Sequence, residues 1–411
     1  MLDMDSDAHA ASAGRSLWYS IFQALENERC LDLRFRATRT GLQDHDLVPN
    51  YKVMKQLALR NKLGILYRPF IAISLVIIPT LALFQWLLAL FVSATRAPGE
   101  SGVRLHIVPT TQVNITLIEA ALLADPSLKE QLHDRDILTI GQLSGKVGLS
   151  GVIHCIASHI LLLYHIFRSD RSRRTDLLLH SRDAFGLLLL VHFAQQHPND
   201  IFATEDHYQR WAFLLSHYCK DFRIIQHGPL DMGIGFPHSF GVVRVVYIRD
   251  QIFSHEFAKY YPIQQITVFS TVRSFTKNSF SEVGIFLASS FPSIDDEIEL
   301  IKLILAKRNI PIIVKFHPAH LYDSRKRVLV ALASHVCFAH DVPACQLFVS
   351  HSSFMEFDYR ASGIPTFSIA RLGGPGETAQ AIFALLETRQ TQCRPADPIF
   401  IDPFSDPKND K

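Results

Sequence analysis

The chain has 411 residues, of which 48% are hydrophobic and 19% are charged, and its formal net charge is +2. This composition excludes a disordered chain, which needs low hydrophobicity and high net charge, and it lacks the basic excess of a nucleic-acid-binding protein. At about 100–200 residues per domain, the length predicts two or three domains. The six cysteines contain no C-x-x-C pair, which argues against a disulfide framework or a zinc site and indicates a reducing compartment.

The N-terminal part contains the strongest single signal in the sequence. Residues 1–68 are predicted to be a helical region without a function of its own. Residues 69–95 carry no charge, and about 20 apolar residues suffice to cross a bilayer. A buried core helix of this length without a polar face is rare. We therefore predict that residues 69–95 associate with a membrane.

Two arrangements of this apolar segment stay open. Basic residues are more frequent before it than after it, so the positive-inside rule places its N-terminal side in the cytoplasm. A straight span would then send the remainder of the chain outside, although the free cysteines indicate a reducing compartment. Pro79 interrupts helix hydrogen bonding inside the segment. We therefore favour a re-entrant hairpin broken at Pro79 over a straight span.

Strand and helix patterns alternate after residue 100. The predicted strands are 103–110, 200–206, 222–228, 242–248, 266–271, 282–290, 310–318, 345–353 and 364–370. The predicted helices are 116–124, 151–167, 187–196, 207–221, 255–261, 296–309, 324–334 and 354–363. Residues 175–183 are predicted as a strand or turn, and residues 396–411 as a flexible tail.

This alternation predicts an α/β fold with two tandem Rossmann-like domains, at residues 100–265 and 266–395. Ligands of such sheets bind beyond the carboxyl ends of the strands. Polar residues directly after predicted strands are therefore the candidates for a functional site.

Two such clusters lie in the first half of the chain. Glu205-Asp206-His207 follows one predicted strand, and Gln226-His227-Gly228-Pro229 with Asp231 follows the next. Asp206, His227 and Asp231 would supply a general base. The alternative for His227 is a core histidine bonded to the backbone.

Two further clusters lie in the second half. Ser352 and Ser353 precede a predicted helix, whose free N–H groups and dipole favour a phosphate. Lys315 and His317 would neutralise that phosphate, and Glu356 would accept hydrogen bonds from sugar hydroxyls. The alternatives are a plain helix cap for the serines and a simple turn for His317-Pro318.

Metal binding is not predicted. Asp134-Arg135-Asp136 has the D-x-D form that holds divalent ions in some transferases, but it lies in a polar linker and does not follow a strand. The histidines of residues 151–167 have poor spacing for zinc. No metal and no other cofactor is expected.

The motif order resembles a known family. FHP at 316–318, SHSS at 350–353 and E-x6-GIP at 356–365 resemble the C-terminal nucleotide-binding domain of bacterial GT-B glycosyltransferases. Within this family, the motifs are most similar to those of capsule and lipopolysaccharide enzymes that use CMP-activated acidic sugars of the Kdo and sialic-acid type. IIQHG at 224–228 resembles the N-domain of the Kdo-transferase-like enzymes. The resemblance covers roughly residues 100–395, but the paired-acid-Gly motif of the sialyl families is not present as such.

The resemblance implies that His317, Ser352 and Ser353 bind CMP, and that Asp206, Asp231 or His227 is catalytic. The expected protein is a metal-independent glycosyltransferase at the inner membrane, with its domains facing the cytoplasm. Its partners would be a CMP-linked sugar donor, a cell-surface glycan or lipid-linked acceptor and the membrane, with no nucleic acid. The alternatives are a CDP-polyol phosphotransferase of the teichoic-acid type and a membrane-tethered, catalytically inactive scaffold.

Overall fold

The computed structural model describes residues 16–39, 63–95, 103–109, 115–205, 209–228, 235–269, 284–289, 293–316, 325–337, 342–351 and 353–392. These residues form two compact units. Within the described ranges, the first unit comprises residues 16–269 together with 353–363, and the second comprises 284–316, 325–351 and 364–392. The first unit thus includes helices from both N-terminal segments that the sequence analysis had set apart. The predicted domain boundaries themselves stay predictions.

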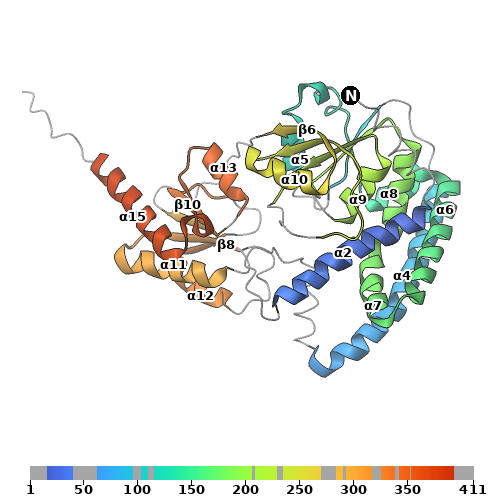
Figure 1. The fold of residues 1–411 in the computed structure, drawn as a ribbon, viewed down its shortest axis with the longest axis horizontal. Helices are drawn as coiled ribbons and strands as arrows, with labels where there is room; N and C mark the ends of the chain where they lie inside the picture. Colours follow the sequence, from blue (N-terminus) through green and yellow to red (C-terminus); the bar gives the residue numbers. More distant parts are fainter. Residues whose placement is uncertain are drawn as a thin grey trace, which may run out of the picture. The chain divides into compact units, whose positions relative to one another are not determined.

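The first unit is built on a six-stranded sheet in which every strand pair is parallel (Figure 1). The strand order is β2-β1-β3-β4-β5-β6. The strand bounds are β1 Leu105–Ile107, β2 Asp136–Ile137, β3 Ile201–Thr204, β4 Asp221–Ile225, β5 Val243–Ile248 and β6 Ile263–Val268. A parallel sheet covered on both faces calls for continuous apolar strands, and β3 is buried at every position. The predicted mixed α/β class with parallel strands is confirmed.

Alternate side chains of these strands enter two different cores. Ile201 and Ala203 belong to the core that contains α5 (Ile115–Leu122), whereas Phe202 belongs to the core that contains α8 (Ala184–Gln196) and α9 (Arg210–Tyr218). The strand period of two residues produces this division. The shorter elements of this unit are α10 Ser254–Tyr260, α13 Met355–Ala361 and the 3-10 turns η1 Gly64–Leu66, η3 Pro126–Leu128, η4 Ser181–Asp183 and η5 Gln251–Phe253.

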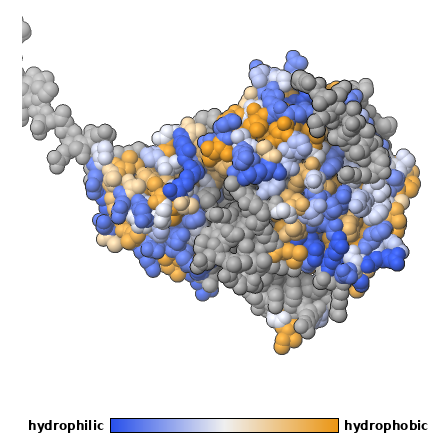
Figure 2. All heavy atoms as spheres, viewed as in Figure 1, coloured by the Kyte–Doolittle hydropathy of each residue, from blue (hydrophilic) through white to orange (hydrophobic). Residues whose placement is uncertain are grey.

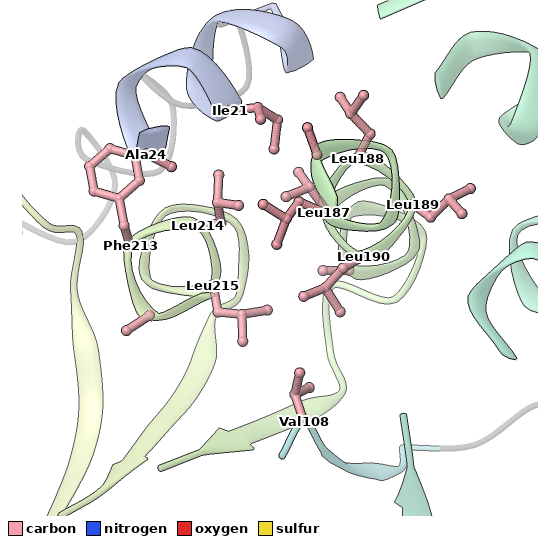
Figure 3. Close-up of a cluster of buried hydrophobic side chains, with 14 of the residues drawn as sticks. Ile21, Ala24, Val108, Leu187, Leu188, Leu189, Leu190, Phe213, Leu214 and Leu215 are labelled. Carbon is pink, nitrogen blue, oxygen red and sulfur yellow. The ribbon is translucent and has the colours of Figure 1, made fainter. Parts of the chain in front are cut away.

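Helix α2 (Leu17–Arg39) is an integral part of the first unit. Figure 3 shows Ile21 and Ala24 of α2 beside α8 and α9, and both side chains are fully buried. The side chain of Asn27 donates to the carbonyl of His238 at 2.9 Å and accepts from its N–H at 3.0 Å. The N-terminal helix therefore fixes a segment that lies some 200 residues away in the chain.

The apolar segment forms one helix, α4 (Tyr67–Thr95), with Pro79 inside it. The predicted hairpin broken at Pro79 is therefore wrong. Proline removes a single backbone donor, and an apolar sequence on both sides keeps the remaining helix intact. Helix α4 packs on α6 through Ala82 and Ala89, and the indole Nε1–H of Trp86 donates to His159 Nδ1 at 3.0 Å.

Helix α6 (Ile140–Arg168) is longer than predicted and contains a kink at Gly148, where φ is 77°. Gly151 allows the close approach of α8, because a Cβ atom there would lie 2.6 Å from Nε2 of His192. The following segment is α7 (Arg171–His180), so the predicted strand or turn at 175–183 is wrong. Its run of three leucines suits either structure, and packing beside α2, α4 and α6 selects the helix.

Three stretches of the described chain are long and apolar enough to cross a membrane by composition: 76–94, 142–168 and 173–196. They differ in how far the protein itself covers them, with 17%, 44% and 78% of the most apolar window buried, respectively. The third stretch ends in α8, which is therefore a core helix. The first is largely uncovered.

The second unit contains a five-stranded, all-parallel sheet in the order β11-β10-β7-β8-β9. The strands are β7 Ile285–Ser289, β8 Ile312–Phe316, β9 His335–Cys337, β10 Leu347–Ser350 and β11 Thr366–Ser368. The helices are α11 Ile294–Lys307, α12 Lys326–Leu332, α14 Ile369–Leu372 and α15 Pro375–Gln392. Apolar residues of α11, α12 and α15 share one core with β7, β8 and β10.

Candidate functional site

The strand order of the first sheet reverses between β1 and β3. Ligands of open parallel sheets bind beyond the carboxyl ends of the strands at such a reversal, because the helices leave in opposite directions there. At this point, Thr204 Oγ1 donates to the carbonyl of Val108 at 2.8 Å and joins the two strand ends. The next residue, Glu205, is completely buried.

His227 lies beside Glu205 at the end of the neighbouring strand β4. Its Nδ1 is 2.5 Å from the carbonyl oxygen of Glu205. A carbonyl only accepts, so Nδ1 carries the proton, and the lone pair of a neutral ring is then on Nε2. Of the three predicted catalytic residues, His227 is the one that the described chain contains. Asp206 and Asp231 lie outside the described residues.

Gln226 holds the turn that presents His227. Its side chain is buried, its Oε1 accepts from the N–H of Arg249 at 3.0 Å and its Nε2 donates to the carbonyl of Gly228 at 3.3 Å. The amide thereby links the ends of β4 and β5 and fixes the chain on both sides of His227. The sequence analysis placed Gln226 in this cluster but gave it no role.

Arg249 follows β5 and was missed in the sequence analysis. Its side chain is 2% exposed and forms an ion pair with Asp358 of α13. Its guanidinium also lies over the rings of Phe269 and Phe354, at 5.0 and 5.9 Å from the ring centres. The sequence could have identified Arg249 as a candidate, since it directly follows a predicted strand. Its charge is already balanced by Asp358.

The strand order of the second sheet reverses between β7 and β10. Ser289 ends β7 and its hydroxyl bonds the buried carboxylate of Glu297. His351 directly follows β10 and is 9% exposed. Its Nε2 lies 3.7 Å from Oδ2 of Asp296, and its backbone carbonyl accepts a hydrogen bond from Ser368 Oγ at 2.8 Å. A histidine and a hydroxyl-bearing strand end are thus held rigidly at the reversal point.

The first turn of α11 carries Asp295, Asp296 and Glu297. Carboxylates there complement the helix dipole and repel a phosphate. The N-terminus of α11 is therefore unsuited to anion binding.

The predicted serine site has a local explanation. Ser353 Oγ accepts from the N–H of Met355 at 3.3 Å, as in a cap of the following turn. Glu356 is buried and pairs with Arg360 at 2.5 Å. Both residues belong to the first unit, whereas the half-buried Lys315 lies in β8 of the second. His317 and Ser352 lie outside the described residues, and the nucleotide-binding roles of all five residues stay predictions.

A third polar cluster lies toward the amino ends of β1 and β3, away from the reversal point. Nε2 of the buried His106 is 2.8 Å from Asp200, and its Nδ1 is 3.3 Å from Asp136, which Lys146 also contacts at 2.6 Å. The hydrogen bond from His106, with that from Lys146, lowers the pKa of Asp136 to about 2. Asp136 of the D-x-D sequence thus already has two partners, Lys146 and His106.

Because the pKa of Asp136 is lowered in the folded protein, we expect the fold to lose stability at acidic pH. The carboxyl group has an ordinary pKa of 3.8 and a folded pKa of about 2. The ionised carboxylate contributes fully to the free energy of unfolding when the pH is above the ordinary pKa. This contribution is lost as the pH falls from about 4 to 2. Asp136→Asn should lower the free energy of unfolding at neutral pH by about 2 kcal/mol and flatten its pH dependence below pH 4. Denaturant unfolding at several pH values measures both, and the exposed Asp134→Asn is the control.

Within the described ranges, no group of three or more His, Cys, Asp or Glu side chains could hold a metal ion. No protein-family model matches this chain, and a comparison with curated proteins finds no match. The site residues themselves therefore carry the functional inference.

Proposed function

We propose that this protein is a membrane-associated GT-B glycosyltransferase that moves a sugar from a CMP-activated acidic sugar to a cell-surface glycan or lipid-linked acceptor. The proposal is carried by one observation: two parallel sheets each reverse their strand order once, with polar side chains at that point. In the first sheet these are Glu205, Gln226 and His227, and in the second they are Ser289, Ser350 and His351. A GT-B enzyme has two Rossmann-like domains, and two parallel sheets of this kind support that assignment.

In this proposal His227 supplies the base, because its Nδ1–H tautomer gives Nε2 a lone pair for the acceptor hydroxyl proton. Lys315 and His317 bind the phosphate that leaves with CMP. The apolar helix α4 keeps the enzyme beside a lipid-linked acceptor.

Nucleotide binding tests the proposal. Calorimetric titration of the full chain in detergent should show binding of CMP in preference to UMP and GMP. His317→Ala should weaken CMP binding by about ten- to a hundredfold, the worth of a hydrogen bond to a charged group. The matched control is His335→Ala, an exposed histidine at the amino end of β9.

Each other outcome has a defined meaning. Binding of UMP or GMP in place of CMP would contradict the donor class. Absence of binding by any nucleotide would favour the catalytically inactive scaffold. Full transfer activity of His317→Ala would overturn the nucleotide-binding role of His317.

A CDP-polyol phosphotransferase is the second candidate, because the His227-Gly228 turn and the His317-Pro318 turn suit that chemistry equally. The bond in the product separates the two enzymes. A glycosidic bond supports the glycosyltransferase, and a phosphodiester bond supports the phosphotransferase.

A further inference from the structure

Helix α4 is exposed along nearly half of its circumference. The side that packs on α6 is narrow and contains Ala82, Ala89 and Ser93, which are less than 10% exposed. Large apolar side chains occupy the outward side. They include Val76, Leu83, Phe84, Leu87, Leu88 and Phe91, with exposed fractions of 52–71%. At about 100° per residue, these side chains spread over an arc of about 140°.

Helix α6 extends this apolar surface. Its exposed residues recur at helical spacing along one side, and residues 147–167 contain no Asp, Glu, Lys or Arg. They are Leu149, Ile153, Ile160, Leu161, Tyr164 and Phe167, with exposed fractions of 42–54%. Because α4 and α6 lie side by side, we call this surface the α4–α6 face (Figure 1). Figure 2 shows apolar residues along the right-hand rim, where α6 lies in Figure 1.

A fluid hydrocarbon phase fits the α4–α6 face better than a folded partner does. The exposed side chains of α4 cover a broad arc of that helix, and those of α6 continue the same apolar surface onto a second helix. Soluble monomers rarely expose contiguous apolar patches of this kind. At the far end of α6, Arg168 donates to the Tyr164 hydroxyl at 2.8 Å and Phe167 is exposed beside it. An aromatic and arginine pair of this type is typical of the boundary between hydrocarbon and headgroups.

The opposite face of α6 decides how the helices lie. Cys155, Leu162 and Ile166 are buried on that side and belong to the same core as α8, α9 and the six-stranded sheet. If α6 crossed the bilayer, it would take this sheet into the hydrocarbon, where the polar side chains and open strand edges of the sheet would be unsatisfied.

We propose that the α4–α6 face is embedded in one leaflet of a lipid bilayer, with both helix axes along the membrane plane and neither helix spanning it. The exposed apolar side chains contact acyl chains, and Arg168 lies at the headgroups. The inference rests on the membrane association within the proposed function, and it is independent of the sugar chemistry.

This arrangement can be tested by determining on which side of the membrane each end of α4 lies. Ile65 before α4 is 94% exposed and Val103 after it is 59% exposed. The double variant Ile65→Cys, Val103→Cys, with Cys30 and Cys393 changed to serine, is reconstituted into sealed vesicles of phosphatidylcholine and phosphatidylglycerol. The four cysteines that remain are buried. A membrane-impermeant maleimide is added, and the labels on each molecule are counted by mass spectrometry.

An in-plane α4 puts both cysteines on the same side, so each molecule should carry two labels or none. A spanning α4 would give one label per molecule and overturn the proposal. Complete labelling after detergent is added shows that both cysteines are reactive.

A second measurement tests α6. Ile160→Glu places a charge on the α4–α6 face, and we expect flotation with the same vesicles to show about tenfold weaker partition. The control is Leu303→Glu, an exposed leucine of α11 in the second unit. Unchanged partition of Ile160→Glu would overturn the role of α6. A lipid-free dimer that Ile160→Glu dissociates would show that a second copy covers this face. CMP titration in detergent should be the same for Ile160→Glu and wild type, so failure here is distinct from failure of the proposed function.

Discussion

If the protein is the proposed glycosyltransferase, replacing His227 with alanine should lower the rate of sugar transfer by about 10²- to 10⁴-fold, the range expected when a general base is lost. The reason is the hydrogen bond from Nδ1 to the Glu205 carbonyl, which assigns the accepting lone pair to Nε2. The measurement is the transfer rate at saturating donor, with the affinity for CMP determined in parallel. The affinity should be unchanged, because His227 is proposed to act on the acceptor hydroxyl and not on the nucleotide.

His255→Ala is the matched control for this prediction. His255 is exposed in α10 of the same unit, so its loss should leave the rate within a factor of about two. His227→Asn restores a side chain that can donate to the Glu205 carbonyl but cannot take a proton, so it should be as slow as the alanine variant. Activity of His227→Asn near that of wild type would show that His227 only positions the loop.

Replacing Arg210 with methionine should lower the free energy of unfolding of the first unit by about 3–5 kcal/mol. Arg210 is 3% exposed, its Nε lies 3.3 Å from Glu28 Oε1 and its Nη1 lies 2.7 Å from Asp183. Without the guanidinium, the buried carboxylate of Glu28 loses this ion pair, although His180 Nδ1 still lies 3.4 Å from its Oε2. Removing one partner of a buried ion pair is costly. The three tryptophans all lie in the first unit, so denaturant unfolding followed by tryptophan fluorescence reports on it.

Two further variants make the Arg210 result specific. Glu28→Leu combined with Arg210→Met should recover most of the lost stability, because two apolar side chains leave no buried charge. Arg244→Met removes an exposed guanidinium of the same unit, whose Nε lies 3.5 Å from Asp221, and it should change stability by less than about 1 kcal/mol. If the single and double variants were equally unstable, the loss would come from packing and not from charge.

Prediction was most successful where neighbouring residues decide the structure. The strand of 200–206 and the helix of 207–221 appear as β3 and α9, slightly shortened, because a buried parallel strand and an amphipathic helix each have a local pattern. The pattern of residues 175–183 was ambiguous for the same reason: three leucines in a row suit either structure. Packing in the helical layer made that segment α7.

The position of His227 after a strand could be predicted from the sequence, but its contacts could not. Placing functional residues after strands led to His227, and the same principle applied to residues 242–248 would have led to Arg249. It gave no means of knowing that Arg249 pairs with Asp358, because that contact joins residues more than 100 positions apart. The capping contact of Ser353 and the pairing of Glu356 with Arg360 are local, yet several side chains nearby could have taken those roles.

By itself, the sequence determined the alternation of strands and helices, the parallel class of both sheets and the apolar character of residues 69–95, since each depends on the order of nearby side chains. Only the tertiary structure decided the strand orders, the partner of each buried charge and the place of α2 within the first unit. These depend on contacts between distant residues, which no local pattern encodes. The same holds for the apolar helices: their composition is alike, and the layers packed against them leave α4 uncovered and bury α8.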